Sequence, residues 1–237
     1  MTESRQFALP FVQAAQAQKH LTVNEAFARL DALAMLRLEA VGLDTPPAAP
    51  EDGSAWGVGA APAGLWAGQA GRVAIFDNGG WVFADPRAGW RGWLVSVGAE
   101  VLHDGAGWVS GALALSSGRA ATRLRIAETD HEIGAEPDST TTALIPAGAQ
   151  VIGVTGRILA EVAGTLSAFD LGVAGAEDRY GNGLGLAAGS FIRGLSGTPV
   201  TYYSPTALVL TAQGGAFATG LIRLAVHMVE LEPPALP

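Results

Sequence analysis

Leu221-Ile-Arg-Leu-Ala-Val-His-Met-Val-Glu230 is the stretch that decides the fold, because its apolar and polar side chains nearly alternate. Successive side chains of a β-strand point to opposite faces, so this alternation predicts a strand with one buried face. Arg223 and His227 are expected on the opposite, outer face. The apolar face consists of Ile222, Leu224, Val226 and Met228.

Strand-like stretches of the same kind continue upstream of this segment as far as residue 120. They are separated by Gly-containing turns, and no helical pattern interrupts them. This pattern predicts an antiparallel β-sandwich, jelly-roll-like, over residues 120–237. The expected strands cover residues 123–127, 141–144, 150–162, 167–173, 190–195, 200–203, 207–212 and 221–230.

An internal repeat marks a second, smaller β-module before the sandwich. Val73-Ala-Ile-Phe-Asp-Asn-Gly-Gly-Trp-Val-Phe83 is echoed by Val101-Leu-His-Asp-Gly-Ala-Gly-Trp-Val-Ser110. Each unit is expected to be a β-hairpin, since Asp, Asn and Gly supply the positive φ angles that tight turns require. The six Trp residues are expected in the core of this module. The first domain therefore spans residues 1–112, with a boundary in the small-residue segment 111–119.

A helix is predicted over residues 22–40, so the fold class is mainly β with an N-terminal helix. Thr22 and Glu25 match a capping box, and Gly42 and Pro46 follow as helix stops. The apolar stripe either packs on its own domain or meets copies of itself around a symmetry axis. The stripe consists of Val23, Phe27, Leu30, Ala34, Leu38 and Val41.

Composition limits the classes of partner. The formal net charge of -8 disfavours nucleic acid, whose binding depends on Lys and Arg at the phosphates. The chain has no Cys, so disulfides, thiolate metal sites and a Cys nucleophile are excluded. Neither a signal peptide nor a membrane-inserted segment is expected. Only 15% of residues are charged, which leaves much neutral surface and favours a homo-oligomer.

Several short runs resemble the DUF2793 family of phage-related proteins, over roughly residues 7 to 95. The longest is Leu9-Pro10-Phe-Val-Gln-Ala-Ala-Gln-Ala-Gln-Lys-His-Leu-Thr-Val-Asn-Glu-Ala-Phe-Ala-Arg-Leu-Asp-Ala-Leu33. The others are Pro46-Pro47-Ala-Ala-Pro50, Trp66-Ala-Gly-Gln-Ala-Gly71, Trp81-Val-Phe83 and Pro86-Arg-Ala-Gly-Trp90. The C-terminal half is similar to the terminal domains of head spikes and tail fibres.

What the resemblance implies is a structural spike or fibre protein of a phage or gene transfer agent. Residues 1–112 would attach to other particle proteins, and the domain at 120–237 would bind a host capsular or surface polysaccharide. The particle surface is the expected location, after synthesis in the bacterial cytoplasm. A trimer is favoured, as is usual for fibres, and a pentamer at a capsid vertex is the alternative. The resemblance brings no catalytic residues.

Aromatic residues beside polar ones are the candidate carbohydrate-binding site, because sugar rings stack on aromatic planes while polar groups bind hydroxyls. The first group is a predicted turn containing Asp178, Arg179, Tyr180 and Asn182. Tyr202 and Tyr203 form the second group. Core packing or turn chemistry is the alternative role for each residue. The net charge of -8 would repel a strongly anionic polysaccharide unless Arg179 and Arg193 gathered at the site, so a neutral or weakly charged glycan is the expected ligand.

Other motifs are assigned structural or solvated roles. The four His residues show no zinc-site spacing. The acidic segment 128–138 is expected to be a solvated turn, and the alternative is that it binds Ca²⁺. Gly181-Asn-Gly-Leu-Gly185 has no following helix, so it does not predict a dinucleotide site. No Gly-x-Ser-x-Gly motif occurs. The chain is therefore expected to need no cofactor or metal and not to be an enzyme, a glycan-degrading depolymerase being the alternative function.

Overall fold

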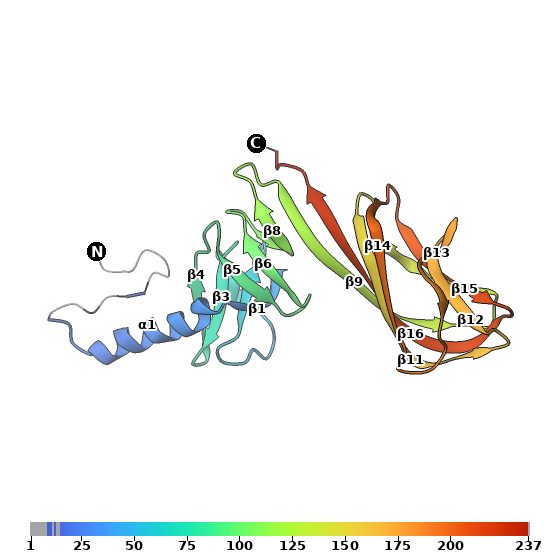
Figure 1. The fold of residues 1–237 in the computed structure, drawn as a ribbon. Helices are drawn as coiled ribbons and strands as arrows, with labels where there is room; N and C mark the ends of the chain where they lie inside the picture. The colour runs from blue at the N-terminus through green and yellow to red at the C-terminus, as the bar shows by residue number, and fades with distance from the viewer. Residues whose placement is uncertain (1–8, 11, 13–14, 237) are drawn as a thin grey trace. The chain divides into compact units, whose positions relative to one another are not determined.

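The computed structural model describes residues 9–10, 12 and 15–236, which form a mainly β chain with one α-helix (Figure 1). Parts of the quoted resemblance, at residues 11, 13 and 14, lie outside the described residues. The chain divides into two compact units: the first ends at Ala112 and the second begins at Leu113. Each unit has its own core, and each is described by itself.

The first unit is a mixed seven-stranded sheet with the order β4-β3-β2-β1-β5-β6-β7. Strand β1 lies at its centre and pairs in parallel with both β2 and β5, whereas all the other pairs are antiparallel. The elements are α1 (Lys19–Ala34), β1 (Arg37–Leu43), β2 (Ala55–Val58), the 3-10 turn η1 (Gly64–Trp66), β3 (Val73–Asp77), β4 (Gly80–Ala84), β5 (Arg91–Leu94), β6 (Ala99–His103) and β7 (Trp108–Ser110).

Both predicted hairpins are confirmed. Strands β3 and β4 meet at the pair Asp77 and Gly80, and the two turn residues between them, Asn78 and Gly79, have φ angles of 49° and 77°. Positive φ at both central positions gives the turn the twist that the flanking strands need. Strands β6 and β7 form the second hairpin.

Alternation along the strands gives the first sheet two apolar faces. One face packs with Leu33 of α1, and its cluster includes Leu38, Val73 and Ile75. The other face carries an aromatic cluster in which Trp81 meets Trp66 edge-on at 5.1 Å between ring centroids. The expectation that every Trp lies in the core is wrong for Trp93, which belongs to neither cluster and is 47% exposed.

The helix prediction over residues 22–40 is wrong at both ends. The helix begins at Lys19 after Gln18, so Thr22 lies inside it and forms no capping box. It ends at Ala34, because a turn at residues 35–36 leads directly into strand β1, which begins at Arg37. The backbone N–H of Trp93 donates to the Leu36 carbonyl at 2.8 Å and fixes this strand in the sheet. Sheet pairing therefore overrides the helical periodicity of the sequence.

The predicted apolar stripe of the helix does not face its own sheet. Phe27 is 63% exposed and Leu30 is 40% exposed, whereas Leu33 is buried. Leu38 is also buried, but as part of strand β1. The stripe that remains on the helix, Val23, Phe27, Leu30 and Ala34, is thus largely available to another partner.

The second unit is a sandwich of a four-stranded sheet, β10-β15-β12-β13, and a five-stranded sheet, β14-β11-β16-β9-β8. The pairs β10–β15, β11–β14, β11–β16, β12–β13, β12–β15 and β9–β16 are all antiparallel. Its strands are β8 (Ala112–Leu115), β9 (Ala121–Ile133), β10 (Asp138–Ile145), β11 (Gln150–Gly164), β12 (Ala168–Val173), β13 (Ala176–Leu184), β14 (Phe191–Thr201), β15 (Thr206–Gln213) and β16 (Phe217–Glu232).

The order of pairing is that of a jelly roll. Strand β12 pairs with β13, β11 with β14, β10 with β15, and β9 with β16, so the chain is a long hairpin folded at the β12–β13 turn. Wrapping this hairpin adds the pairs β11–β16 and β12–β15 and separates the strands into two sheets. The sandwich prediction is therefore confirmed.

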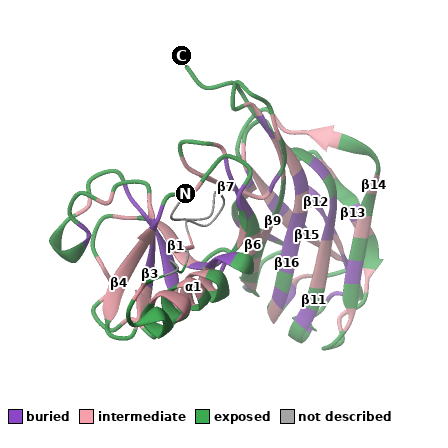
Figure 2. Ribbon diagram, turned by 90° about the vertical axis from the view of Figure 1, so that its left-hand side faces the viewer, coloured by how far each residue is buried: buried purple, intermediate pink, exposed green. Residues whose placement is uncertain are grey.

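The core of the sandwich lies between its two sheets, in the buried residues coloured purple in Figure 2. The quoted stretch of β16 behaves as its alternation predicts, since Ile222, Leu224, Val226 and Met228 are all 0% exposed. No helix in the described part of the chain is long and apolar enough to cross a membrane.

We expect Leu210→Ala to lower the free energy of unfolding by about 2–5 kcal/mol, because the side chain is fully buried between the sheets. The matched control is Leu195→Ala on β14, where the side chain is 74% exposed and the loss should stay within about 0.5 kcal/mol. Urea denaturation measures both changes. Equal losses at the two positions would contradict the placement of the core.

Candidate functional site

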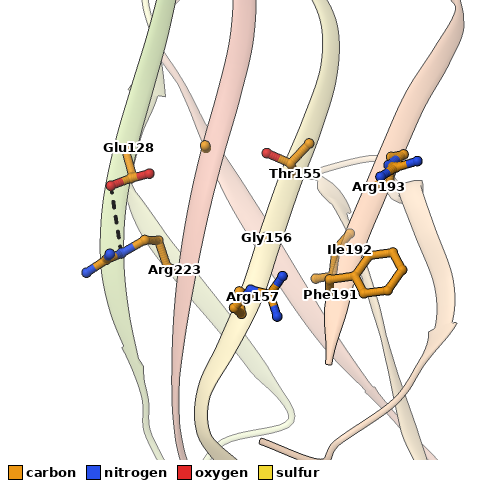
Figure 3. A pocket seen from close by; sticks show the side chains of 9 residues that line it. Glu128, Thr155, Gly156, Arg157, Phe191, Ile192, Arg193 and Arg223 are labelled. Atoms are coloured by element: carbon orange, nitrogen blue, oxygen red, sulfur yellow. Dashed lines mark ion pairs between the residues drawn. The ribbon is translucent and has the colours of Figure 1, made fainter. Parts of the chain in front are cut away.

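A hollow of about 400 Å³ lies on the outer face of the five-stranded sheet, across β14, β11, β16 and β9 (Figure 3). Its lining combines three Arg residues with one exposed aromatic ring. The lining residues are Glu128, Thr155, Gly156, Arg157, Phe191, Ile192, Arg193, Arg223 and Ala225.

The register of the sheet arranges this lining in two rows. In the first row, Arg157 lies between Phe191 on one side and Arg223 on the other. In the second row, Thr155 lies between Arg193 and Ala225. Thr155 and Ala225 of the second row are short, whereas Arg157 and Arg223 of the first row are long. This difference in length leaves the hollow open.

Arg223 is held by the carboxylates of β9. Its Nε and Nη2 atoms donate to the two carboxylate oxygens of Asp130 at 2.6 and 2.7 Å, and Glu128 Oε1 lies 3.7 Å from Nε. The hydrogen bonds from Arg223 lower the pKa of the Asp130 carboxyl, and the same contact raises the pKa of Arg223. Arg223 is therefore fixed as a cation at one side of the hollow.

Arg157 and Arg193 have no carboxylate partner among the described residues. Arg157 Nη1 donates to the backbone carbonyl of Gly189 at 2.9 Å. The guanidinium of Arg193 lies 5.9 Å from the centre of the Phe191 ring, within the range of a cation–π contact. Phe191 itself is 66% exposed, so its ring and two unneutralised cations stand together at the rim.

The middle of the hollow is lined by the small residues Thr155, Gly156 and Ala225. The Thr155 hydroxyl and His227 Nε2 share a hydrogen bond of 2.9 Å, and Ala225 presents only a methyl group. His227 lies on the outer face of β16, as the alternation of the sequence predicts. The hollow thus offers cationic donors, a hydroxyl and one aromatic face to a ligand.

The structure places the predicted glycan-binding residues differently from the sequence interpretation. Residues 178–182 belong to strand β13 and not to a turn, so the turn prediction is wrong. Tyr180 is only 2% exposed, because it is the single residue of this strand that packs fully into the core. Its ring is covered and offers no face to a sugar, whereas Asp178, Arg179 and Asn182 are exposed on β13.

One hydrogen bond joins the two predicted groups of glycan-binding residues, 178–182 and 202–203. The Tyr180 and Tyr202 hydroxyls lie 2.7 Å apart, and Tyr202 is partly buried against the same core. The predicted strand at residues 200–203 ends at Thr201, so both Tyr202 and Tyr203 lie in the connection to β15. The ring of Tyr203 is 88% exposed and apart from this pair. Carbohydrate binding by these residues stays a prediction.

The sequence interpretation missed Phe191 and Arg157. A signal for Phe191 was present, since Phe191-Ile-Arg-Gly-Leu195 alternates with Ile192 as its buried member. Reading that alternation places Phe191, Arg193 and Leu195 on one outer face. Nothing local indicates that Arg157 is their neighbour, because only the pairing of β11 with β14 brings it there.

The acidic segment 128–138 is largely strand, so its interpretation as a turn is wrong. Residues up to Ile133 belong to β9, and β10 begins at Asp138. Asp130 pairs with Arg223, while His131 Nε2 lies 2.8 Å from the Ser139 hydroxyl and burial lowers the pKa of this His. Among the described residues, no group of three or more His, Asp or Glu could hold a metal ion.

A comparison with protein-family models gives one match, which lies in the first unit. Residues 23–109 match "Protein of unknown function (DUF2793)". The resemblance predicted from the sequence is thereby confirmed, and this DUF2793 segment, residues 23–109, ends just before the boundary at Ala112.

The other comparisons are sparse. A comparison with curated proteins found no match. Among solved structures, the chain is similar to a chain of "Cyanophage Pam1 capsid asymmetric unit", with 20% identity and a TM-score of 0.38, covering 46% of this chain and 86% of that chain. The jelly-roll assignment rests on the strand pairing and not on this likeness.

We expect Tyr180→Phe to flatten the loss of stability at alkaline pH. Burial and the hydrogen bond with Tyr202 raise the pKa of the Tyr180 phenol above its ordinary value of 10.0. The unfolded phenol ionises first, so stability present below about pH 10 is lost as the pH rises further. Urea denaturation between about pH 8 and 11 measures the slope. An unchanged slope in the variant would show that Tyr180 is not the group responsible.

Proposed function

We propose that the chain is a structural protein of a phage-like particle and adheres to a host surface polysaccharide. The observation that carries the adhesion is the hollow on β14, β11, β16 and β9, where the exposed Phe191 ring stands beside Arg157 and Arg193. The DUF2793 match supports a place on such a particle.

The lining suits a sugar better than an apolar ligand. A sugar ring stacks its C–H face on an aromatic plane, and Phe191 presents such a plane at 66% exposure. Guanidinium groups and the Thr155 hydroxyl supply hydrogen bonds to ring substituents. An open hollow binds each sugar weakly, so useful adhesion requires several copies acting on one polymer.

The arrangement favours binding over cleavage. Glycoside hydrolysis generally needs two carboxylates placed across the scissile bond. Glu128 is the only carboxylate that lines the hollow, and it faces Arg223. We therefore propose a non-enzymatic adhesin, with the depolymerase as the alternative that the experiment below distinguishes.

Attachment to the particle is assigned to the first unit. The DUF2793 segment accounts for most of the unit that ends at Ala112, and the hollow lies wholly in the unit that begins at Leu113. Because the two units have separate cores, attachment by one and adhesion by the other are physically compatible.

Self-association is assigned to the helix stripe Val23, Phe27, Leu30 and Ala34. Its spacings of four, three and four residues are those of a coiled-coil seam, and Phe27 and Leu30 are exposed. The occupant that fits this spacing is the same helix of a second copy. A trimer is the favoured assembly, with a pentamer as the alternative.

We expect Phe191→Ala to weaken binding to immobilised bacterial surface polysaccharides about tenfold, through loss of the stacking plane. The measurement is biolayer interferometry of the full chain on a panel of neutral, carboxylated and phosphorylated polymers. Trp93→Ala is the matched control, because it removes another exposed aromatic ring, in the first unit and outside the predicted glycan-binding residues. Failure to bind any polymer contradicts adhesion, and release of reducing ends would establish the depolymerase instead.

We expect Phe27→Asp to dissociate the oligomer, since a charge in the centre of an apolar seam must be desolvated on association. Light scattering at micromolar concentration gives the mass of the wild-type chain and the variant. Asn24→Asp introduces the same charge on an exposed position outside the stripe and should leave the mass unchanged. A monomeric wild-type chain would exclude this mode of assembly.

A further inference from the structure

The hollow concentrates positive charge on a chain that is negative overall. The formal net charge is -8 and the whole sequence has 14 Lys and Arg residues, yet three Arg side chains line this one hollow with a single carboxylate. Such a cluster attracts anions locally whatever the sign of the total charge.

The Arg cluster is not explained by pairing within the sheet. Arg157 and Arg223 lie directly opposite each other on β11 and β16. Like charges in directly opposite positions destabilise a sheet, so a structural role alone gives no reason for this arrangement. Asp130 compensates Arg223 through two hydrogen bonds, but Arg157 reaches only the neutral Gly189 carbonyl.

Two cations therefore remain for a ligand at the Phe191 side of the hollow. Arg157 faces Phe191 across the strand pair, and Arg193 follows two residues later on the same outer face of β14. Figure 3 shows Phe191 and Arg193 at one side of the hollow, Arg223 near Glu128 at the other, and Arg157 on the strand between them.

We propose, building on the adhesion function, that the hollow selects sugars that carry a carboxylate. The carboxylate accepts hydrogen bonds from the guanidinium groups of Arg157 and Arg193 while the sugar ring covers Phe191. In a uronic or sialic acid the carboxylate is bonded directly to the ring, which matches a ring plane immediately beside the cations. A phosphate ester carries its charge on an additional linkage, further from the ring.

This proposal replaces the neutral glycan expected from the net charge. That expectation held unless cationic residues gathered at the site, and the pairing of β14, β11 and β16 gathers three of them. Guanidinium groups are planar and always charged, and they bind carboxylates with two parallel hydrogen bonds. The affinity should accordingly fall as salt is added, because the hollow is open to solvent.

The test compares carboxylated polysaccharides, including polygalacturonate, with the same polymers after chemical reduction of their carboxyl groups. Each pair keeps its linkages and differs only in charge. We expect the full chain to bind the carboxylated form at least about tenfold more tightly, the usual effect of one charge-assisted hydrogen bond. Arg157→Gln and Arg193→Gln should each remove most of this difference.

Arg87→Gln is the matched control, since it removes one exposed positive charge from the first unit, outside the hollow and outside the predicted glycan-binding residues. Circular dichroism and thermal melting confirm folding, and the two hollow variants act as checks on each other. Equal binding of the paired polymers, tighter binding of phosphorylated ones, or no binding of any carboxylated polymer would overturn the carboxylate preference. In the first two outcomes adhesion through Phe191 still stands, so failure of the preference is distinguished from failure of the proposed function.

Discussion

The burial of one face of β16 is the constraint on which the second unit depends. Ile222, Leu224, Val226 and Met228 are fully buried, so the side chains between them must point outward. A slip of one residue in register would exchange the two faces completely. The same apolar alternation that closes the core therefore fixes Arg223, Ala225 and His227 on the outer surface. The candidate site is a consequence of the packing that lies behind it.

The position of β16 between β11 and β9 then decides what surrounds Arg223. On one side it meets the acidic residues of β9, and on the other it meets Arg157. Carboxylates hold the Arg223 side of the hollow, and among the residues that the structure describes no carboxylate pairs with an Arg on the opposite side. The positive charge is therefore unevenly distributed over this sheet surface. Arg223 is paired with carboxylates of β9, whereas Arg193 on β14 is not paired with a carboxylate of the described residues. This polarity, and not the net charge of the chain, sets the local charge that a molecule approaching this surface meets.

The seven-stranded sheet of the first unit differs from the five-stranded sheet, because both of its faces are apolar. Strand β1 lies at the centre and is paired on both sides, and it requires Leu38 in a fully buried position. The helix covers one face through Leu33, while Trp66 closes the other against Trp81. Consequently the helix meets its own sheet on a different side from its seam of Phe27 and Leu30. That division leaves Phe27 and Leu30 exposed on the helix.

The sequence by itself determined the features that depend on local spacing. The alternation of residues 221–230, the turns at Asn78 and Gly79, the sandwich class and the DUF2793 resemblance all follow from patterns a few residues long. The tertiary structure decided the rest, because the deciding interactions join distant segments. Residues 37–43 form a strand because they are hydrogen-bonded to β5. Tyr180 is part of the core because it is the one residue of β13 whose side chain is buried. Arg157, Arg193 and Arg223 are far apart in sequence, and only the register of three paired strands makes them one site.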